Sequence, residues 1–162
     1  MLIREIQIKD NEAIKKIIQS SLESLGLAIP GSAYFDPQLS HLQQYYSGLA
    51  QANYWIVEHE GQVVGGVGIA PFNEQAKICE LQKLYLGPQA QGLGLANQLM
   101  ETALAFAQKH YNYCYLETMH ELVAACRLYE KFDFTLLAEP LEGSEHSAMD
   151  AWYLKHLKHL NN

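Results

Sequence analysis

The sequence predicts a single mixed α/β domain, and three observations support this prediction. Some segments alternate apolar and polar residues with the period of two that is typical of strands. Others repeat apolar residues with the 3.6-residue period of helices, and the two kinds of segment alternate along the chain. Apolar residues make up 49% and charged residues 18% of the chain, which is typical of a globular protein with a substantial core. No repeat, low-complexity tract or linker interrupts the sequence, so one domain over 1–162 is expected.

The first half of the chain is expected to alternate between strands and helices. Asp10 or Asn11 can cap the first helix, because such a side chain accepts a hydrogen bond from a free N–H of the first turn. Glu60-Gly61 supplies the turn of a hairpin. In order, the elements are a strand over 2–8, a helix over 11–25, a helix over 38–50, and strands over 54–58, 62–69 and 77–86.

The second half is expected to open with a long helix, because Leu95, Leu99 and Ala103 repeat on one helical face. Earlier in the chain, the glycines at 65, 66 and 68 within one strand indicate a bulge, the close approach of a neighbour, or a flexible packed strand. In order, the later elements are a helix over 92–109, a strand over 113–117, a helix over 121–132, and β segments over 134–138 and 151–157.

Composition excludes several classes of protein. The N-terminus alternates and carries charge, unlike a signal peptide, and no stretch is long enough to span a bilayer, so no membrane partner is expected. A net charge of -7 argues against a nucleic-acid partner, which would need a basic face. Cys79, Cys114 and Cys126 lack metal-ligand spacing and are odd in number, which indicates reduced thiols in the cytoplasm.

The segment 84–97 predicts a binding site for a phosphorylated ligand. An apolar run reaches a break at Gly87-Pro88, and a glycine-bearing turn then leads into the long helix. The first N–H groups of a helix lack internal partners, and the helix dipole leaves partial positive charge there. Gly92, Gly94 and Ala96 carry little bulk, so a phosphate can approach the main chain.

Three blocks of the sequence resemble the GNAT superfamily of N-acetyltransferases. Gln91-Gly92-Leu93-Gly94-Leu95-Ala96 resembles the signature Gln/Arg-x-x-Gly-x-Gly/Ala of that family, and 79–86 is similar to its central strand. The segment Ala125–Phe134 resembles the family's Ala-x-x-Leu-Tyr-Glu-Lys-x-Gly-Phe block, with Asp133 in place of the glycine. Rival fingerprints fit poorly, because the turn lacks the Gly-Lys-Ser/Thr of a Walker loop and Asn97 replaces a Rossmann glycine.

The resemblance implies a GNAT-like fold, a twisted and mostly antiparallel sheet with splayed central strands and flanking helices. It further implies that acetyl-CoA enters the gap between those strands as co-substrate, without a metal. Because Gln91 replaces the commoner arginine, main-chain donors must supply most of the phosphate recognition, with Lys83 and Lys131 as extra candidates or as solvated surface lysines. The residues implied for cofactor binding are Leu84, Tyr85, Leu86, Gln91, Gly92, Leu93, Gly94, Leu95, Ala96 and Asn97.

Acetyl transfer to an amine needs a proton acceptor and a proton donor. The resemblance implies that Tyr129 protonates the leaving thiolate; the alternative is a tyrosine that only packs on the sheet. Glu80 is the first candidate for the base, four residues before Leu84 and so expected on the same sheet face. The alternatives are a structural role for Glu80, with Glu117 or water as the base.

Four residues are candidates for binding the acceptor. Tyr34 and Phe35 lie in the region that varies within the family, beside Asp36, and can form a pocket wall or simply pack a loop. Glu117 can orient the amine or be a strand-end carboxylate, and His120 can relay protons or cap a loop.

Together these residues predict an acetyl-CoA-dependent N-acetyltransferase. The acetyl group would move to a primary amine of a small molecule or protein by direct attack in a ternary complex. The alternatives are a CoA-binding regulatory module without turnover, another acyl-CoA as donor, or a hydroxyl as acceptor. Members of the family commonly pair, so the resemblance implies a homodimer as one of the states open to this chain.

Overall fold

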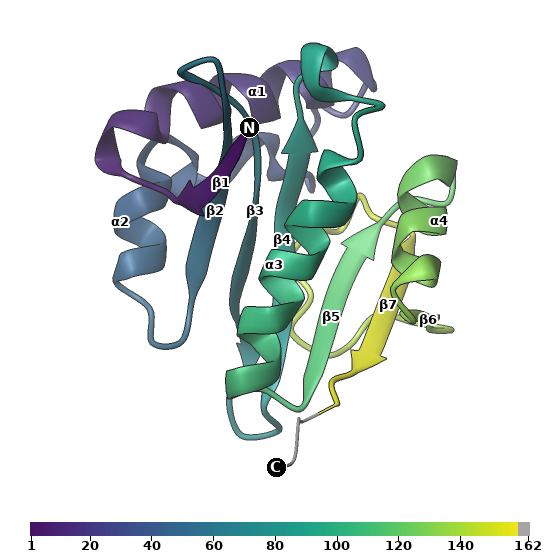
Figure 1. Cartoon of the computed structure of the whole chain (residues 1–162). Helices are drawn as coiled ribbons and strands as arrows, with labels where there is room; N and C mark the ends of the chain where they lie inside the picture. The colour runs from purple at the N-terminus through teal and green to yellow at the C-terminus, as the bar shows by residue number, and fades with distance from the viewer. Residues whose placement is uncertain (159–162) are drawn as a thin grey trace.

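The computed structural model describes residues 1–158 and contains one seven-stranded sheet in the order β1-β2-β3-β4-β5-β7-β6 (Figure 1). Short 3-10 turns lie at Ile8–Asp10, Ala33–Phe35, Pro37–His41 and Pro88–Ala90. The strands and helices are β1 (Leu2–Glu5), α1 (Asn11–Ser24), α2 (Leu42–Ser47), β2 (Asn53–His59), β3 (Gln62–Asn73), β4 (Ile78–Leu86), α3 (Leu95–His110), β5 (Tyr113–Thr118), α4 (Val123–Lys131), β6 (Thr135–Leu136) and β7 (Ala151–His156).

The sheet is antiparallel except between β4 and β5, which run parallel. These two strands pair only over Ile78–Glu80 and Tyr113–Tyr115 and then diverge (Figure 1). The mostly antiparallel sheet with splayed central strands is therefore confirmed. Residues 81–86 of β4 keep β3 on one side and present an open backbone edge on the other.

The order of the elements matches the expectation from the sequence, but several bounds differ: β3 runs on to Asn73, four residues past its expected end, and α3 begins at Leu95, three residues later than expected. The strand expected over 2–8 ends at Glu5, and the segment 134–138 contributes only the two residues of β6. The helix expected over 38–50 is a 3-10 turn followed by the six-residue α2. Pro37 begins that turn and His41 has φ -143, an extended value that interrupts the helix.

Two hydrophobic cores cover the two faces of the sheet. The helices α1 and α2 pack over one face, where Ile14 and Leu42 are fully buried. The helix α3 packs over the other face, where Leu99 and Ala103 are fully buried. No helix within the described part of the chain is long and apolar enough to cross a membrane.

The glycines of β3 make room for two tyrosines of the α1/α2 core. A Cβ on Gly66 would lie 2.5 Å from the ring of Tyr54, and a Cβ on Gly68 would lie 2.6 Å from the hydroxyl of Tyr46. The close approach of a neighbour is therefore the reason for glycine at these two positions.

Replacing Gly66 with alanine is expected to lower the free energy of unfolding by about 1–3 kcal/mol, because the new methyl group overpacks a filled core. It would also meet the carbonyl oxygen of Trp55 at 2.7 Å, which is backbone and cannot rotate away. Urea denaturation measures the change. The control is Gly48→Ala, whose Cβ would meet its nearest atom, a carbonyl oxygen, only at 3.3 Å, and an equal loss in both variants would contradict the packing argument.

A bulge in β4 changes which way its side chains point. Gly66 of β3 pairs with Tyr85 and Gly68 pairs with Gln82, so one residue of β3 faces two of β4. Lys83, one of those two, has φ +52, in the left-handed region that non-glycine residues rarely adopt. The hydroxyl of Tyr54 donates a hydrogen bond of 2.8 Å to the carbonyl oxygen of Lys83.

The bulge corrects one prediction made from the sequence. Glu80 and Leu84, four residues apart, were expected on the same sheet face, but they lie on opposite faces. Glu80 is linked through Gln82 to Tyr46 in the α1/α2 core, whereas Leu84 packs against the α3 core. The extra residue in the bulge breaks the two-residue alternation on which the expectation depended.

Candidate functional site

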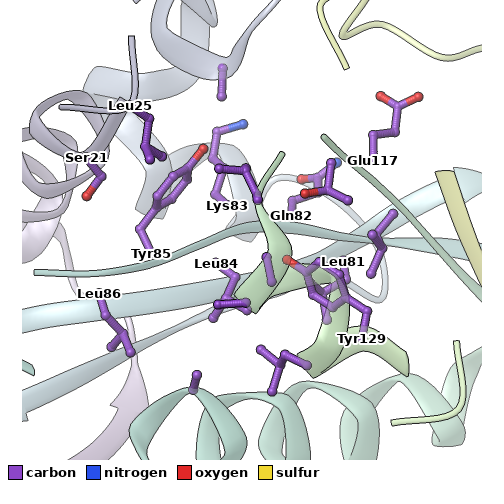
Figure 2. A pocket seen from close by; sticks show the side chains of 18 of the residues that line it. Ser21, Leu25, Leu81, Gln82, Lys83, Leu84, Tyr85, Leu86, Glu117 and Tyr129 are labelled. Atoms are coloured by element: carbon purple, nitrogen blue, oxygen red, sulfur yellow. The ribbon is translucent and has the colours of Figure 1, made fainter. Parts of the chain in front are cut away.

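A cavity of about 710 Å³ lies where β4 and β5 diverge, and residues from both sheet faces line it (Figure 2). Leu84, Leu86 and Tyr129 lie on one side of β4, and Lys83 and Tyr85 rise on the other. The cavity therefore has two parts, which we call the α4 side and the α1 side after the helices that border them. The open strand gap joins the two parts.

The glycine-bearing turn closes one end of the cavity. Gly92 and Gly94 have φ +78 and +75, and a Cβ at either position would meet no other atom within 4 Å. Gly94 is the N-cap of α3, so the free N–H groups of the first helical turn lie beside this open space. The side chain of Gln91 donates a hydrogen bond of 3.3 Å to the carbonyl oxygen of Leu86, which holds the turn against the end of β4.

The residues expected to bind the cofactor lie along one path. Leu84, Tyr85 and Leu86 offer the open backbone edge of β4, and the turn continues from its end. Six of the ten predicted residues line the cavity; the exceptions are Leu93, Gly94, Leu95 and Asn97, which are in the same turn and helix start. An extended ligand that carries amides and ends in phosphate fits this arrangement, because a strand edge and a helix start supply complementary groups.

The two lysines considered for phosphate contact lie in different surroundings. Lys131 donates a hydrogen bond of 2.7 Å to the side chain of Asn97 and so lies beside the helix start. Lys83 points to the α1 side, where it is nearly fully buried against Asp36. Lys83 is therefore not a phosphate ligand.

Replacing Gly94 with valine is expected to weaken CoA binding about tenfold or more. A β-branched residue disfavours φ +75, and its branch would enter the space beside the free amides. Calorimetric titration of CoA measures the change. The matched control is Gly61→Val, because Gly61 has φ +76, also meets no atom within 4 Å, and lies in the β2–β3 turn. Equal CoA affinity in both variants would contradict the proposed site.

Tyr129 packs against the sheet and also reaches the cavity. Its ring lies 6.1 Å from the rings of both Phe134 and Tyr153, and the residue is buried. Burial raises the pKa of its hydroxyl, which therefore stays protonated at neutral pH. Its hydroxyl lines the cavity on the α4 side (Figure 2), so the packing role and the donor role are compatible.

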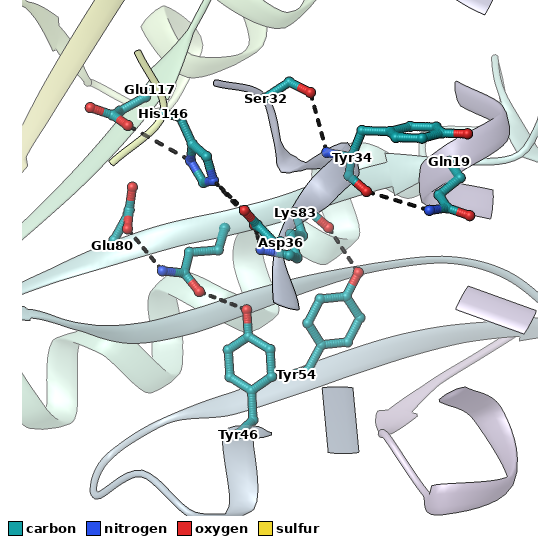
Figure 3. A network of polar contacts seen from close by, with 11 residues as sticks. Gln19, Ser32, Tyr34, Asp36, Tyr46, Tyr54, Glu80, Lys83, Glu117 and His146 are labelled. Carbon is teal, nitrogen blue, oxygen red and sulfur yellow. Dashed lines mark hydrogen bonds and ion pairs between the residues drawn. The ribbon is translucent and has the colours of Figure 1, made fainter. Parts of the chain in front are cut away.

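Glu80 faces the α1 side of the cavity and has an unusual proton affinity. The pKa of Glu80 is raised to about 7, first by burial and also by the nearby charge of Glu117, although the hydrogen bond from Gln82 and the charges of His146 and Lys83 oppose the rise. The amide of Gln82 donates a 2.8 Å hydrogen bond to Glu80 and accepts one of 2.7 Å from Tyr46 (Figure 3). A carboxyl group with this pKa can accept a proton at neutral pH.

A second polar group surrounds Asp36 on the α1 side (Figure 3). The Nζ of Lys83 lies 2.6 Å from Asp36 Oδ2, and Nε2 of His146 lies 3.1 Å from each Asp36 oxygen. Although burial alone would raise the pKa of Asp36, the hydrogen bond from His146 and the charge of Lys83 hold it below its usual range. The hydrogen bond to Asp36 in turn raises the pKa of His146.

Glu117 lies next to this group and is almost completely buried. Its Oε2 accepts hydrogen bonds from the hydroxyls of Tyr115 and Ser144. Its Oε1 lies 3.8 Å from Nδ1 of His146, which is an ion-pair contact but too long for a hydrogen bond, and it has no hydrogen-bond partner among the described residues. The polar end of the cavity therefore holds one buried oxygen that can accept a further hydrogen bond.

The other residues predicted to bind the acceptor lie elsewhere. The hydroxyl of Tyr34 donates to Glu23, Phe35 is 62% exposed, and neither lines the cavity. The backbone N–H of His120 donates to Asp150, and its ring does not reach the cavity wall. The histidine beside the carboxylates is His146, which the sequence did not single out, because its contact with Asp36 joins segments 110 residues apart.

Comparisons with known proteins identify the family of this chain. A family model described as the acetyltransferase (GNAT) family matches residues 16–134. The Escherichia coli (strain K12) protein named uncharacterized N-acetyltransferase YjgM is 39% identical over 159 residues, which cover 96% of this chain and 95% of that protein.

Two solved structures are similar in fold. An acetyltransferase of the GNAT family from Staphylococcus aureus Mu50 has a TM-score of 0.83 at 17% identity, covering 97% of this chain and 99% of that one. The structure of yncA from Salmonella typhimurium with its cofactor acetyl-CoA has a TM-score of 0.77 at 20% identity, covering 100% of this chain and 96% of that one. At these identities the likeness shows the fold.

Proposed function

Because this chain belongs to the acetyltransferase (GNAT) family, we propose that it is an acetyl-CoA-dependent N-acetyltransferase that acts on a primary amine of a small molecule or protein. The observation that carries this proposal is the cavity itself. One continuous space joins the glycine-bearing turn to a carboxyl group with a pKa of about 7, and Tyr129 lines the same space. This arrangement supports a site that combines a place for a phosphorylated donor with a candidate base and a candidate acid.

The proposed reaction is direct attack in a ternary complex. Acetyl-CoA supplies an activated thioester carbonyl. The acceptor enters as an ammonium, and its nitrogen loses two protons. Glu80 takes the first, directly or through a water; Tyr129 gives its proton to the departing sulfur and regains one from the second proton of the nitrogen through water. The nitrogen–carbon bond forms, the carbon–sulfur bond breaks and its electron pair goes to sulfur, so protons and charges balance. Holding both reactants in one cavity supplies much of the remaining acceleration.

A covalent relay through cysteine is less well supported than direct attack. Cys79 and Cys114 are fully buried in the core beneath the sheet, and Cys126 donates a hydrogen bond to the carbonyl oxygen of Met119. Burial raises the pKa of Cys114, which keeps its thiol protonated and unreactive. The three cysteines are free, which supports the proposal that the protein works in the reducing cytoplasm.

We also propose that the transfer needs no metal, because Glu80 and Tyr129 can carry both proton transfers. Glu80, Glu117 and His146 offer polar atoms within 4.8 Å of one another, so this part of the proposal needs its own test. Turnover is expected to be unchanged after dialysis against EDTA. Lost activity that returns when Zn²⁺ is added would contradict it.

A thiol-release assay with acetyl-CoA and a panel of polyamines, amino acids, arylalkylamines and peptides tests the proposed function. Release of CoA that depends on an amine, with the acetylated amine identified by mass spectrometry, is the expected result. Tight CoA binding without release would favour a regulatory module instead. Absence of heat when CoA is titrated into the folded protein would contradict both functions. Longer acyl-CoA donors and hydroxyl acceptors complete the panel, and gel filtration tests the expected homodimer.

A further inference from the structure

The α1 side of the cavity contains two cationic side chains, and both are already paired. Among the described side chains that line the cavity, these are Lys83 and His146. Both contact the same carboxylate, Asp36, at 2.6 Å and 3.1 Å. The side chain of Lys83 is only 3% exposed, so it cannot turn toward a ligand without breaking its buried 2.6 Å ion pair with Asp36. Neither cation is available to receive a negatively charged group from a substrate.

The carboxyl groups of the same region are only partly satisfied: Oε1 of Glu117 has His146 Nδ1 at 3.8 Å, an ion-pair contact longer than a hydrogen bond. The buried Oε1 of Glu117 has no hydrogen-bond partner among the described residues, and Glu80 lies close to it. A buried acceptor without a donor is costly, so its position favours a ligand that brings N–H groups. An alkyl ammonium group is a compact cation with three N–H donors and no acceptor, which matches these two carboxyl groups.

Apolar side chains form the remaining wall of the α1 side. They come from the end of α1, from the loop after it, from β4 and from the segment before α4, and the ring of Tyr85 lies across from the helix (Figure 2). A ligand whose ammonium group lies at Glu117 would extend along these groups. The apolar residues of this wall are Leu22, Leu25, Leu27, Tyr85 and Leu122.

We propose that the acceptor is a small primary amine with an apolar body and no carboxylate beside the amine, and this rests on the proposed acetyltransferase function. An α-amino acid would bring its carboxylate next to Glu80 and Glu117, where both cations are already bound to Asp36. Like charges placed together in a buried site repel one another, so they weaken the binding of a ligand that carries a carboxylate. The specificity of the site is therefore for amines and against the corresponding amino acids.

Matched pairs of acceptors that differ by one carboxylate test this inference on the unaltered protein. The pairs are phenethylamine with phenylalanine, tyramine with tyrosine, and isoamylamine with leucine. In each pair the amine is expected to have a kcat/KM about 100-fold higher or more. Phenylalanine methyl ester is the control for bulk, and it should react much better than phenylalanine. Equal or faster acetylation of the amino acids would overturn the inference.

Two variants locate the cause of the selectivity. Asp36→Asn releases Lys83 from its carboxylate, and the preference for phenethylamine over phenylalanine is expected to narrow about tenfold or more. Glu117→Gln is expected to raise the KM for phenethylamine about tenfold while the affinity for CoA stays unchanged. An unaltered preference in a folded Asp36→Asn protein would show that the paired cations do not set the selectivity.

Calorimetric binding of the same pairs to the complex with CoA separates this inference from the proposed function. Binding of phenethylamine but not phenylalanine, without turnover of either, would support the inference while the enzymatic function fails. Turnover of amino acids in preference to amines would support the function while the inference fails. If neither member of any pair binds or reacts, the inference is overturned.

Discussion

Replacement of Tyr129 by phenylalanine is expected to lower kcat about 100-fold or more while the affinity for CoA stays nearly unchanged. The variant keeps the ring that packs against Phe134 and Tyr153 and loses only the hydroxyl that lines the cavity. Without a proton donor, the departing sulfur must leave as a thiolate in a largely apolar space, which is costly. Because burial raises the pKa of Tyr129, the donor is protonated throughout the neutral range.

Steady-state kinetics with saturating amine and calorimetry with CoA measure the two effects of Tyr129→Phe. The matched control is Tyr153→Phe, because the hydroxyl of Tyr153 donates to Glu130 and does not line the cavity. This control should keep kcat near the wild-type value. An unchanged kcat in Tyr129→Phe would remove this residue from the proposed mechanism.

The replacement Glu80→Gln should remove the bend near pH 7 at which the rising limb of the pH–rate profile levels off. In the wild type, kcat/KM is expected to rise as Glu80 ionises with its pKa of about 7 and then to stay level up to the pKa of the amine, about 10. Without the base, only the neutral amine can react. The rate of the variant should therefore keep rising tenfold per pH unit up to about pH 10, from a level about 100-fold lower or more near pH 7.

The profile of the variant Glu117→Gln distinguishes the two candidate bases. Glu117 is expected to bind the acceptor, so its replacement should leave the bend near pH 7 in place. An unaltered profile in Glu80→Gln, combined with a lost bend in Glu117→Gln, would assign the base to Glu117.

Stability offers an independent check on the proton affinity of Glu80. Its pKa rises from the usual 4.5 to about 7 on folding, so the folded protein holds this proton more tightly than the unfolded chain. The stability contributed by the proton is fully present below pH 4.5 and is lost as the pH rises through 7. Relative to wild type, Glu80→Gln should therefore gain about 3 kcal/mol in unfolding free energy between pH 4.5 and pH 8. A constant difference across this range would show that the pKa is not raised.

Much of the fold could be predicted from local sequence patterns. The hairpin between β2 and β3, the amphipathic α3 and the glycine-bearing turn each depend on residues close together in the chain. The residues proposed for the donor path lie together for the same reason, since the turn and the end of β4 are consecutive. The divergence of β4 and β5 agrees with the family resemblance.

The polar end of the cavity could not be predicted in this way. A lysine does not indicate the left-handed conformation at position 83, where the hydroxyl of Tyr54, from a distant strand, donates a hydrogen bond to the carbonyl oxygen. Similarly, nothing near His146 in the sequence indicates its contact with Asp36. Both features arise when distant segments pack together, and both decide which groups line the α1 side of the cavity.

The bulge at Lys83 also sets which residues of β4 face each side of the cavity. Leu84 and Leu86 point toward α3, while Lys83 and Tyr85 point toward α1. One strand therefore lines both sides of the cavity, and different segments of the chain complete each side. The α4 side, proposed to receive the donor, comes from the middle of the chain, whereas much of the α1 side, proposed to receive the acceptor, comes from its beginning and from the segment that holds His146. Under the proposed function, changes in those outer stretches are expected to alter the choice of acceptor in related enzymes while the acetyl-CoA site is kept.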